Sequence, residues 1–324
     1  MFNRKIILLT FIFFTSAIFG DDEKNINYTQ LDGPISSFCS TSLPAKLRIF
    51  TNFQFVSVNS LYDGDGKEIE DGKEQSNYDG FGNIVSTSEY NLDYSSNVLF
   101  LYFDYFGEKD VGFELSVPVY ISRELNNDEI DLIGVSDFKF GIYYIWEQFF
   151  IIKKMKSAMY YQYSKTGYTI SNFGHLKSVG QKGFGLMHSV DLLISDNSFL
   201  SFKSDLLISS GNFYDESDST QIYTPDRFID IVVRYKNNIL RFFSYSLDFG
   251  IYQYNFEEAG NDKFSDGRYY AFSPHFGFKL LKNKSYGYFD ISHIDFVISY
   301  SIPVGGKNYV KPNTIGLSLN TYFE

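Results

Sequence analysis

The chain has 324 residues and a formal charge of −11, from 28 Lys and Arg against 39 Asp and Glu. This acidic balance argues against nucleic acid as a partner, and the single cysteine, Cys39, excludes a disulfide within the chain. The 27 Tyr and 35 Phe far outnumber the one Trp, and such an aromatic surplus is expected of a protein with rings at two lipid–water interfaces.

The first 20 residues have the pattern of a secretory signal peptide. Arg4 and Lys5 precede a short apolar run over residues 6–18, and this run is too short for a spanning helix. We expect cleavage after Gly20. The following segment, 21–45, is polar and interrupted by glycine and proline, so we expect either a loose periplasmic tail or a small plug inside a larger fold.

Residues 111–121 show the clearest strand pattern in the chain. Glycine, glutamate, serine, proline and tyrosine at the even positions alternate with apolar residues at every odd one: Val111, Phe113, Leu115, Val117, Val119 and Ile121. A period of two indicates a strand with one apolar and one polar face. Eleven residues are also the length that a tilted strand needs to cross a bilayer.

Similar segments recur along the chain, and short polar turns alternate with longer acidic or glycine-rich loops between them. That alternation is typical of outer-membrane barrels, whose short turns face the periplasm. The fold class is therefore all-β, a transmembrane antiparallel up-and-down β-barrel over residues 46–324. We predict 12 strands, with 14 as the alternative because the segment 154–166 is weak. They are expected at 46–62, 87–106, 111–122, 137–147, 154–166, 183–194, 198–211, 227–236, 239–255, 268–281, 286–304 and 313–323.

Charged residues recur on the polar faces of these strands and are predicted to line the lumen. Such a lining favours either a channel that selects by charge or a lattice of ion pairs that fills a narrow barrel. Acids outnumber bases here, which favours cations weakly. The acidic residues are Glu89, Asp93, Glu114, Asp137, Asp191, Asp205, Asp230, Asp248 and Asp295, and the basic ones are Arg48, Lys139, Lys156, Lys203, Arg234 and Lys279.

The first long loop contains Asp63, Asp65 and Glu68, a weak candidate for a metal site. It departs from the calcium-loop pattern, because Lys67 takes the place of the third ligand and Glu68 that of the glycine. We therefore predict no metal and no other cofactor.

Histidines occur only at positions 175, 188, 275 and 293. The segment Ser292–His293, followed by Asp295, is the nearest approach to a catalytic triad, and no Gly-x-Ser-x-Gly motif is present. The chain is therefore not predicted to be an enzyme. The alternation in 183–194 places His188 on the lipid-facing side, and the strand 286–304 changes phase near His293, where a β-bulge could restore it.

Three stretches carry a family resemblance: Leu-Ser-Val-Pro-Val-Tyr at 115–120, Gly-Val-Ser-Asp-Phe-Lys-Phe-Gly at 134–141, and Pro-Val-Gly-Gly-Lys at 303–307 before a last strand ending in Phe323. In this order they resemble the FadL-like outer-membrane proteins grouped with the meta-pathway of phenol degradation. The resemblance implies a barrel that admits small hydrophobic or aromatic solutes. The N-terminal segment of this chain lacks the Asn-Pro-Ala hatch motif, so we do not expect the protein to transport long-chain fatty acids.

Together these features predict an integral protein of the outer membrane of a diderm bacterium. Its expected function is a channel for passive uptake of small hydrophobic or cationic solutes. The alternative is a surface-exposed barrel without an open pore, whose acidic loops bind a host or extracellular partner. Expected partners are membrane lipid, a small-molecule solute and the barrel-assembly machinery. An oligomer would need a flatter and less aromatic stripe on the lipid-facing side of the barrel, and the sequence does not show which strands would form it.

Overall fold

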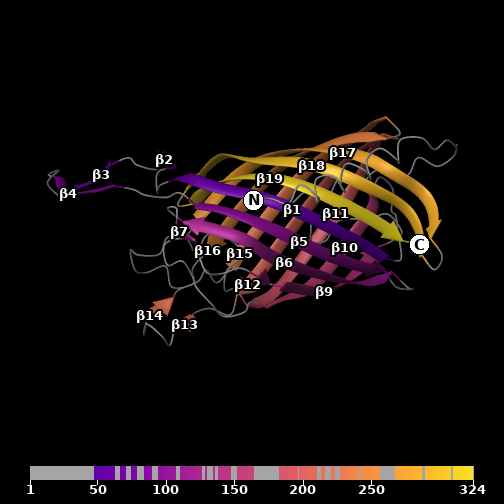
Figure 1. The fold of residues 1–324 in the computed structure, drawn as a ribbon, viewed down its shortest axis with the longest axis horizontal. Coiled ribbons are helices and arrows are strands. Elements are labelled where there is room, and N and C mark those ends of the chain that lie inside the picture. Colours follow the sequence, from indigo (N-terminus) through magenta and orange to yellow (C-terminus); the bar gives the residue numbers. More distant parts are fainter. Residues whose placement is uncertain are drawn as a thin grey trace.

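Twelve strands of the computed structural model form one antiparallel sheet that closes on itself (Figure 1). Each strand pairs with the next along the barrel, and the last pairs with the first, from Leu47 opposite Phe323 to Tyr62 opposite Tyr309. The strands are β1 (Leu47–Tyr62), β5 (Tyr94–Phe106), β6 (Val111–Leu125), β9 (Phe138–Trp146), β10 (Ile152–Tyr163), β11 (Gly183–Ser195), β12 (Ser198–Ser209), β15 (Arg227–Leu240), β16 (Phe243–Asn255), β17 (Gly267–Tyr286), β18 (Phe289–Lys307) and β19 (Tyr309–Phe323).

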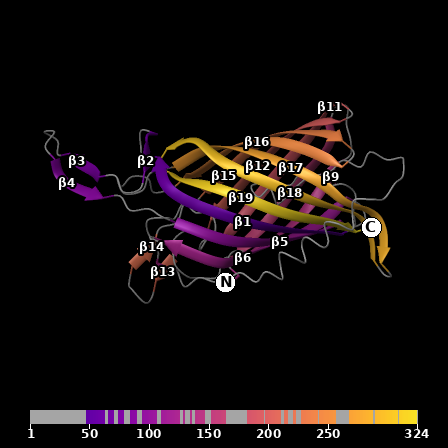
Figure 2. The same cartoon turned by 45° about the horizontal axis from the view of Figure 1, so that its top comes forward.

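The remaining strands are short and lie at the end of the barrel opposite the C-terminus (Figures 1 and 2). β2 (Glu68–Glu70) extends the sheet beside β1, and β7 (Asp128–Glu129) and β8 (Gly134–Val135) pair with β6. Two separate hairpins are formed by β3 (Glu74–Tyr78) with β4 (Ile84–Glu89) and by β13 (Phe213–Asp215) with β14 (Thr220–Ile222).

The structure describes residues 47–62, 66–70, 74–78, 84–89, 94–106, 110–125, 128–129, 134–135, 138–146, 152–163, 182–195, 197–209, 213–215, 220–222, 227–240, 242–255, 267–286, 289–307 and 309–323. The expected signal peptide and the segment 21–45 lie outside these ranges. No helix in the described part of the chain is long and apolar enough to span a membrane.

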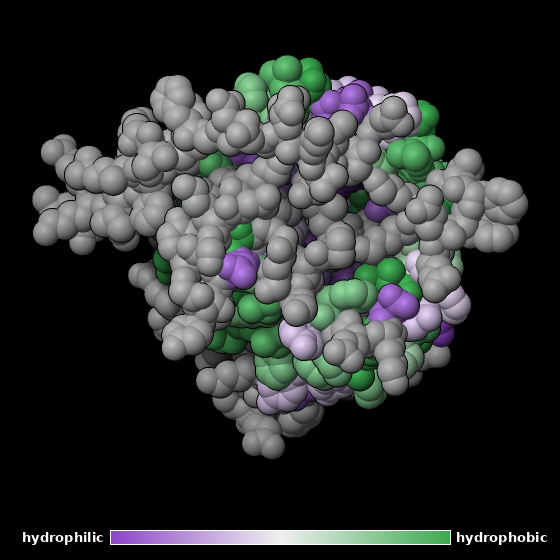
Figure 3. All heavy atoms as spheres, turned by 90° about the vertical axis from the view of Figure 1, so that its right-hand side faces the viewer, coloured by the Kyte–Doolittle hydropathy of each residue, from purple (hydrophilic) through white to green (hydrophobic). Residues whose placement is uncertain are grey.

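Burial alternates along the barrel strands, as a period of two requires. In β6 the odd positions from Val111 to Ile121 point outward and the even ones inward, where Glu114 and Tyr120 are buried. β9 and β11 follow the same rule, with Phe140, Ile142 and Leu186 among the exposed residues. Apolar side chains also lie around the rim when the barrel is viewed from the end with the C-terminus (Figure 3). The closed sheet therefore has an apolar outer surface and a largely polar interior.

The prediction of a 12-stranded barrel is confirmed, but two connections differ from it. β5 begins at Tyr94 because residues 84–89 pair with β3 in a hairpin outside the barrel. The last two strands, expected at 286–304 and 313–323, come closer together, since β18 continues to Lys307 and β19 begins at Tyr309. The change of phase near His293 is confirmed as a register shift between Ile291 and His293.

The predicted orientation of β5 was wrong. With Glu89 and Asp93 predicted to face the lumen, the alternation put Val98 and Tyr102 on the lipid face. Both are buried inside, and Phe103 and Tyr105 are exposed instead. Both faces of this strand are apolar, so hydrophobic periodicity could not choose between them. The structure places Asp104 inward, opposite Arg48 on β1.

Candidate functional site: the barrel interior

Most of the predicted lumen residues lie on the inward face of barrel strands. Glu89 is an exception, because it lies in the β3–β4 hairpin outside the barrel, and Asp93 and Asp137 lie outside the described residues. Where the structure describes side chains, the inward-facing charges balance. Seven acidic residues (Asp104, Glu114, Asp191, Asp205, Asp230, Asp248 and Asp295) face seven basic ones (Arg48, Lys139, Lys156, Lys203, Arg234, Lys236 and Lys279).

One side of the interior is packed with ion pairs, and we call it the charged wall: the inward side chains of β5, β6, β9, β10, β11 and β12 together with Arg48. Arg48 contacts Asp104 at 3.1 Å, and Lys156 forms an ion pair with Glu114. All four side chains are at most 3% exposed. Charges removed from water to this extent are stabilised only when they are paired, so these contacts fix the wall in one arrangement.

Two tyrosines cross neighbouring strands on the charged wall. The Tyr143 hydroxyl on β9 passes over Gly112 on β6 and donates a hydrogen bond of 2.6 Å to Asp104 on β5. Tyr160 on β10 passes over Gly185 on β11 and donates one of 2.6 Å to Asp205 on β12. A Cβ atom at either glycine would overlap the ring, so only glycine fits there.

Cations also lie over these rings. The Lys156 ammonium is 3.7 Å from the centroid of the Tyr143 ring, and the Lys139 ammonium is 4.8 Å from that of Tyr160. Cation–π contacts of this kind gain strength away from water. The cavity between Lys139, Tyr160 and Asp205 measures only about 20 Å³, about the room needed by one water molecule. The charged wall therefore fills its own side of the interior.

The opposite side is lined mostly by small neutral polar residues, and we call this set the neutral wall. Asp248, His275, Lys279 and Asp295 also face inward on the strands of this side. The members of the neutral wall lie on β16, β17, β18, β19 and β1, in adjacent rows of the sheet; Ser246, for example, pairs with His275, which pairs with Ser299 on the next strand. The neutral wall comprises Asn52, Gln54, Ser244, Ser246, Ser273, Ser299, Ser301, Thr314, Ser318 and Asn320, all buried.

Hydrogen bonding on the neutral wall is incomplete. Ser273 donates to Ser301 at 3.0 Å. In contrast, the side-chain polar atoms of Asn52, Ser318 and Asn320 have no hydrogen-bond partner in the part of the protein that the structure describes. Buried polar groups are rarely left in this state and are usually satisfied by water or by a bound molecule. These atoms are closed off from solvent, so a water molecule or a solute must enter the interior beside this wall to satisfy them.

An ion-pair cluster reaches from β15 into the neutral wall, where Asp248 pairs with Ser273 and His275 with Ser246. Arg234 on β15 binds Asp248 on β16 through two hydrogen bonds of 2.7 Å, and His275 Nε2 on β17 lies 3.2 Å from the same carboxylate. Two parallel bonds from a guanidinium hold a carboxylate in a fixed orientation. The Asp248 charge is thereby matched by Arg234, so it does not stand as an unpaired negative charge in the lumen.

Of the three predicted candidates for metal binding, only Glu68 lies among the residues that the structure describes. Asp63, Asp65 and His175 lie outside the described residues, and Glu68 accepts hydrogen bonds from Ser60 and Lys311. No group of three His, Cys, Asp or Glu in the described ranges could hold a metal ion.

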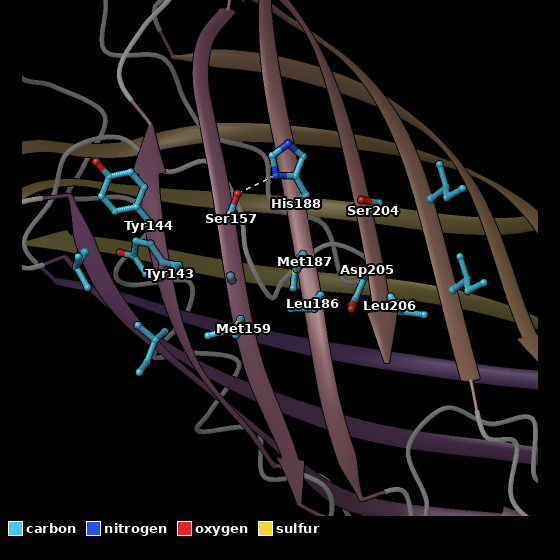
Figure 4. Close-up of a pocket in the computed structure, with 15 residues that line it drawn as sticks. Tyr143, Tyr144, Ser157, Met159, Leu186, Met187, His188, Ser204, Asp205 and Leu206 are labelled. Atoms are coloured by element: carbon cyan, nitrogen blue, oxygen red, sulfur yellow. Dashed lines mark hydrogen bonds between the residues drawn. The ribbon is translucent and has the colours of Figure 1, made fainter. Parts of the chain in front are cut away.

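A second hollow lies on the outward face. It is a groove of about 550 Å³, lined mainly by apolar side chains of β9, β10, β11, β12 and β15. Figure 4 shows Ser157 and His188 at its upper side, joined by a hydrogen bond of 2.9 Å between Oγ and Nδ1, with Ser204 on the next strand. His188 was predicted on the lipid-facing side, and the structure confirms that position.

Comparisons with known proteins give a likeness of structure. No protein-family model and no curated protein matches the chain. An outer membrane channel from Pseudomonas putida F1 is similar with a TM-score of 0.62 and 12% identity, over 87% of this chain and 97% of that one. A FadL homologue from Pseudomonas aeruginosa reaches a TM-score of 0.41 at 10% identity, over 85% and 89%. The NanC porin reaches 0.44 at 9% identity, over 86% and 99%.

The similarity to the Pseudomonas putida channel shows the fold, whereas TM-scores below 0.5 do not establish a common fold with the other two proteins. The fold is that of an outer-membrane β-barrel. Together with the apolar outer surface, it makes this chain an integral outer-membrane protein, as the sequence predicted.

Proposed function

We propose that this barrel is a passive channel that admits small uncharged solutes along the neutral wall. The observation that carries the proposal is the row of buried serine and asparagine side chains whose polar atoms lack protein partners, with Asn52, Ser318 and Asn320 at its centre. Hydroxyl and amide groups both donate and accept hydrogen bonds, so they can replace the water around a neutral solute.

The charge balance of the interior favours neutral cargo over cations. The excess of acids expected from the sequence depended on Glu89, Asp93 and Asp137, none of which is a described inward residue of the barrel. The remaining acids and bases are equal in number, and four of those on the charged wall form two buried ion pairs. Such a lining gives little net field along the lumen.

Two further considerations support a channel and narrow its cargo. The sequence resembles FadL-like proteins of the phenol meta-pathway group, which implies small hydrophobic or aromatic solutes. The solved structure with the same fold is named as an outer membrane channel. We therefore favour small solutes with an apolar body and a hydrogen-bonding group, because the neutral wall can bind that group.

Single-channel recording in planar bilayers tests the proposal. Purified, refolded protein is expected to give discrete openings with a reversal potential near zero in a potassium chloride gradient. Proteoliposomes should also swell in a small neutral solute that protein-free bilayers exclude, such as arabinose. The matched variant is Ser318→Trp, which should lower the conductance several-fold by filling the lumen beside the neutral wall. A folded barrel that stays electrically silent and impermeable would overturn the channel in favour of a closed, surface-binding barrel.

A further inference from the structure

The polar residues at the middle of the outward face lie in one row across three adjacent strands. Ser157 on β10 pairs with His188 on β11, and His188 pairs with Ser204 on β12. Trp146 Nε1 on β9 donates a hydrogen bond of 3.0 Å to Ser157 Oγ, and Ser157 contacts His188 Nδ1 at 2.9 Å (Figure 4). Ser157, His188 and Ser204 of this row belong to the lining of the groove.

Its depth places the row out of reach of lipid headgroups. Ser157 is the sixth residue of 12 in β10, and His188 is the sixth of 13 in β11. A strand of that length crosses the whole hydrocarbon layer, so its middle lies near the bilayer centre. The charged residues with described outward side chains lie within three residues of a strand end: Arg227, Arg268, Asp290, Lys307 and Lys311.

Polar atoms at this depth need a partner within the membrane, because hydrocarbon offers no hydrogen bonds. Ser157 accepts the Trp146 hydrogen, and its own hydroxyl hydrogen is free to be donated to His188 Nδ1; in that tautomer the imidazole proton is on Nε2. His188 Nε2 therefore points a donor, and the Ser204 hydroxyl an acceptor, at whatever covers the groove. The two groups occupy adjacent positions of the sheet.

The surrounding surface also differs from the rest of the barrel. Around the row the outward side chains are mostly aliphatic, with Met159 at 66% and Leu186 at 55% exposure, and the aromatic residues Tyr161, Phe184 and Phe202 lie at its margins. On β16 and β17 the corresponding residues are largely aromatic: Tyr245, Phe249, Tyr270, Phe272, Phe276 and Phe278. A smoother aliphatic stripe is the kind of face that packs against another protein in a membrane, where van der Waals contact and hydrogen bonds drive association.

We propose that the outward face of β10, β11, β12 and β15 is the contact between two copies of this chain in the membrane. A two-fold axis along the membrane normal, passing between His188 and Ser204, brings each His188 to Ser204 of the second copy and satisfies both groups twice. Four strands of at least 12 residues make a face of roughly 750 Å² per copy. That projected area is of the same order as the approximately 800 Å² of accessible surface that each partner buries in a stable interface.

The Ser157–His188 pair also resembles the start of a hydrolytic triad, but the geometry favours a contact. A triad needs an acid to orient the histidine. No Asp or Glu lies near the middle of the outward face among the described side chains. The Ser157 oxygen is moreover engaged by Trp146. The dimer contact does not depend on channel activity, since it lies on the outside of the barrel.

Cysteine cross-linking in intact outer membranes tests the contact. In a Cys39→Ser background, Ser204→Cys is expected to give a covalent dimer on mild oxidation, because the two sulfurs lie beside the axis. The matched control is Phe272→Cys, which is exposed on β17 across the barrel and should remain monomeric. Heat-modifiable mobility on gels confirms that both variants are folded. Equal dimer yields from the two variants, or none from Ser204→Cys, would overturn the proposal.

A second measurement distinguishes association through the hydrogen bonds of His188 and Ser204 from non-specific hydrophobic association. Folded wild-type protein in nanodiscs or mild detergent should have the mass of two chains, and His188→Leu should lower the dimer fraction about tenfold at equal concentration. Conductance per barrel should not change, so loss of dimer is distinguishable from loss of the channel. A wild-type barrel that is monomeric in both environments, with or without bound lipid, would contradict the interface.

Discussion

On the charged wall, Arg48, Asp104, Glu114 and Lys156 are removed from water and each contacts an opposite charge. On the neutral wall, Asn52, Ser318 and Asn320 are equally buried, yet their side-chain atoms have no partner among the described residues. Ion pairs have one good geometry, whereas hydroxyls and amides can exchange partners at low cost. One side of the barrel is therefore held in a fixed arrangement by ion pairs, whereas the other side can form hydrogen bonds with different molecules in turn.

The largest effect is expected from removing one charge of the charged wall. Lys156→Met leaves Glu114 buried without its ion pair, which should lower the free energy of unfolding by about 3–5 kcal/mol. Urea titration of the folded barrel in detergent, followed by tryptophan fluorescence, measures the change. Adding Glu114→Gln should restore most of the loss, and a Lys156→Met barrel as stable as wild type would mean that this wall is hydrated.

A smaller loss is expected where a tyrosine crosses a glycine. Gly112→Ala forces the Tyr143 ring away from Asp104 and should cost about 1–3 kcal/mol in the same titration. The matched control is Gly305→Ala on β18, where the added carbon meets only Tyr270 at 3.7 Å and should be neutral. Combining Gly112→Ala with Tyr143→Ala should show no additional loss, and full additivity would refute the steric explanation.

Removing a single hydroxyl from the charged wall should have a milder effect. Tyr160→Phe keeps the ring over Gly185 but deletes the hydrogen bond to Asp205, which should lower stability by about 1–2 kcal/mol. Ser273→Ala, which deletes a hydrogen bond on the neutral wall, should cost less because water can replace it. The reverse order in urea midpoints would contradict the distinction between the two walls.

The smallest change in stability is expected for a charge placed on the neutral wall. Ser318→Asp should cost less than about 1 kcal/mol if this wall faces a wet lumen, while Ala158→Asp on the charged wall should cost several times more. In bilayers, Ser318→Asp should shift the reversal potential toward cations and Ser318→Lys toward anions. A Ser318→Asp barrel that fails to fold, or folds without any shift in selectivity, would place the solute path elsewhere.

The number of strands and most of their orientations could be predicted from the sequence, because a strand with one apolar face repeats every two residues. The orientation of β5 could not be predicted, because residues 98–103 are apolar on both faces, and Asp104 was missed for that reason. Glu89 was misplaced because its polar alternation continues into a hairpin that leaves the barrel. Hydrophobic periodicity shows which side chains of a strand share a face, but it does not show which sheet the strand belongs to.

The partners within the interior could not be predicted. The ion pair between Lys156 and Glu114 and the fit of Tyr143 over Gly112 depend on the stagger between strands, which no local pattern encodes. The sequence predicted His188 on the outward face, but the pattern of one strand does not explain why a histidine lies there. Its explanation required the pairing of β10, β11 and β12, which places Ser157 and Ser204 on either side.

The pairing of β1 with β19 has a consequence for biogenesis. These strands are the first and last of the barrel, so every nascent chain that ends before Tyr309 leaves both β1 and β18 with an unsatisfied backbone edge. Such edges invite pairing with other chains. The protein is therefore vulnerable from the start of synthesis until its final residues arrive, and a truncation that removes β19 should send the whole barrel to proteolysis in the periplasm.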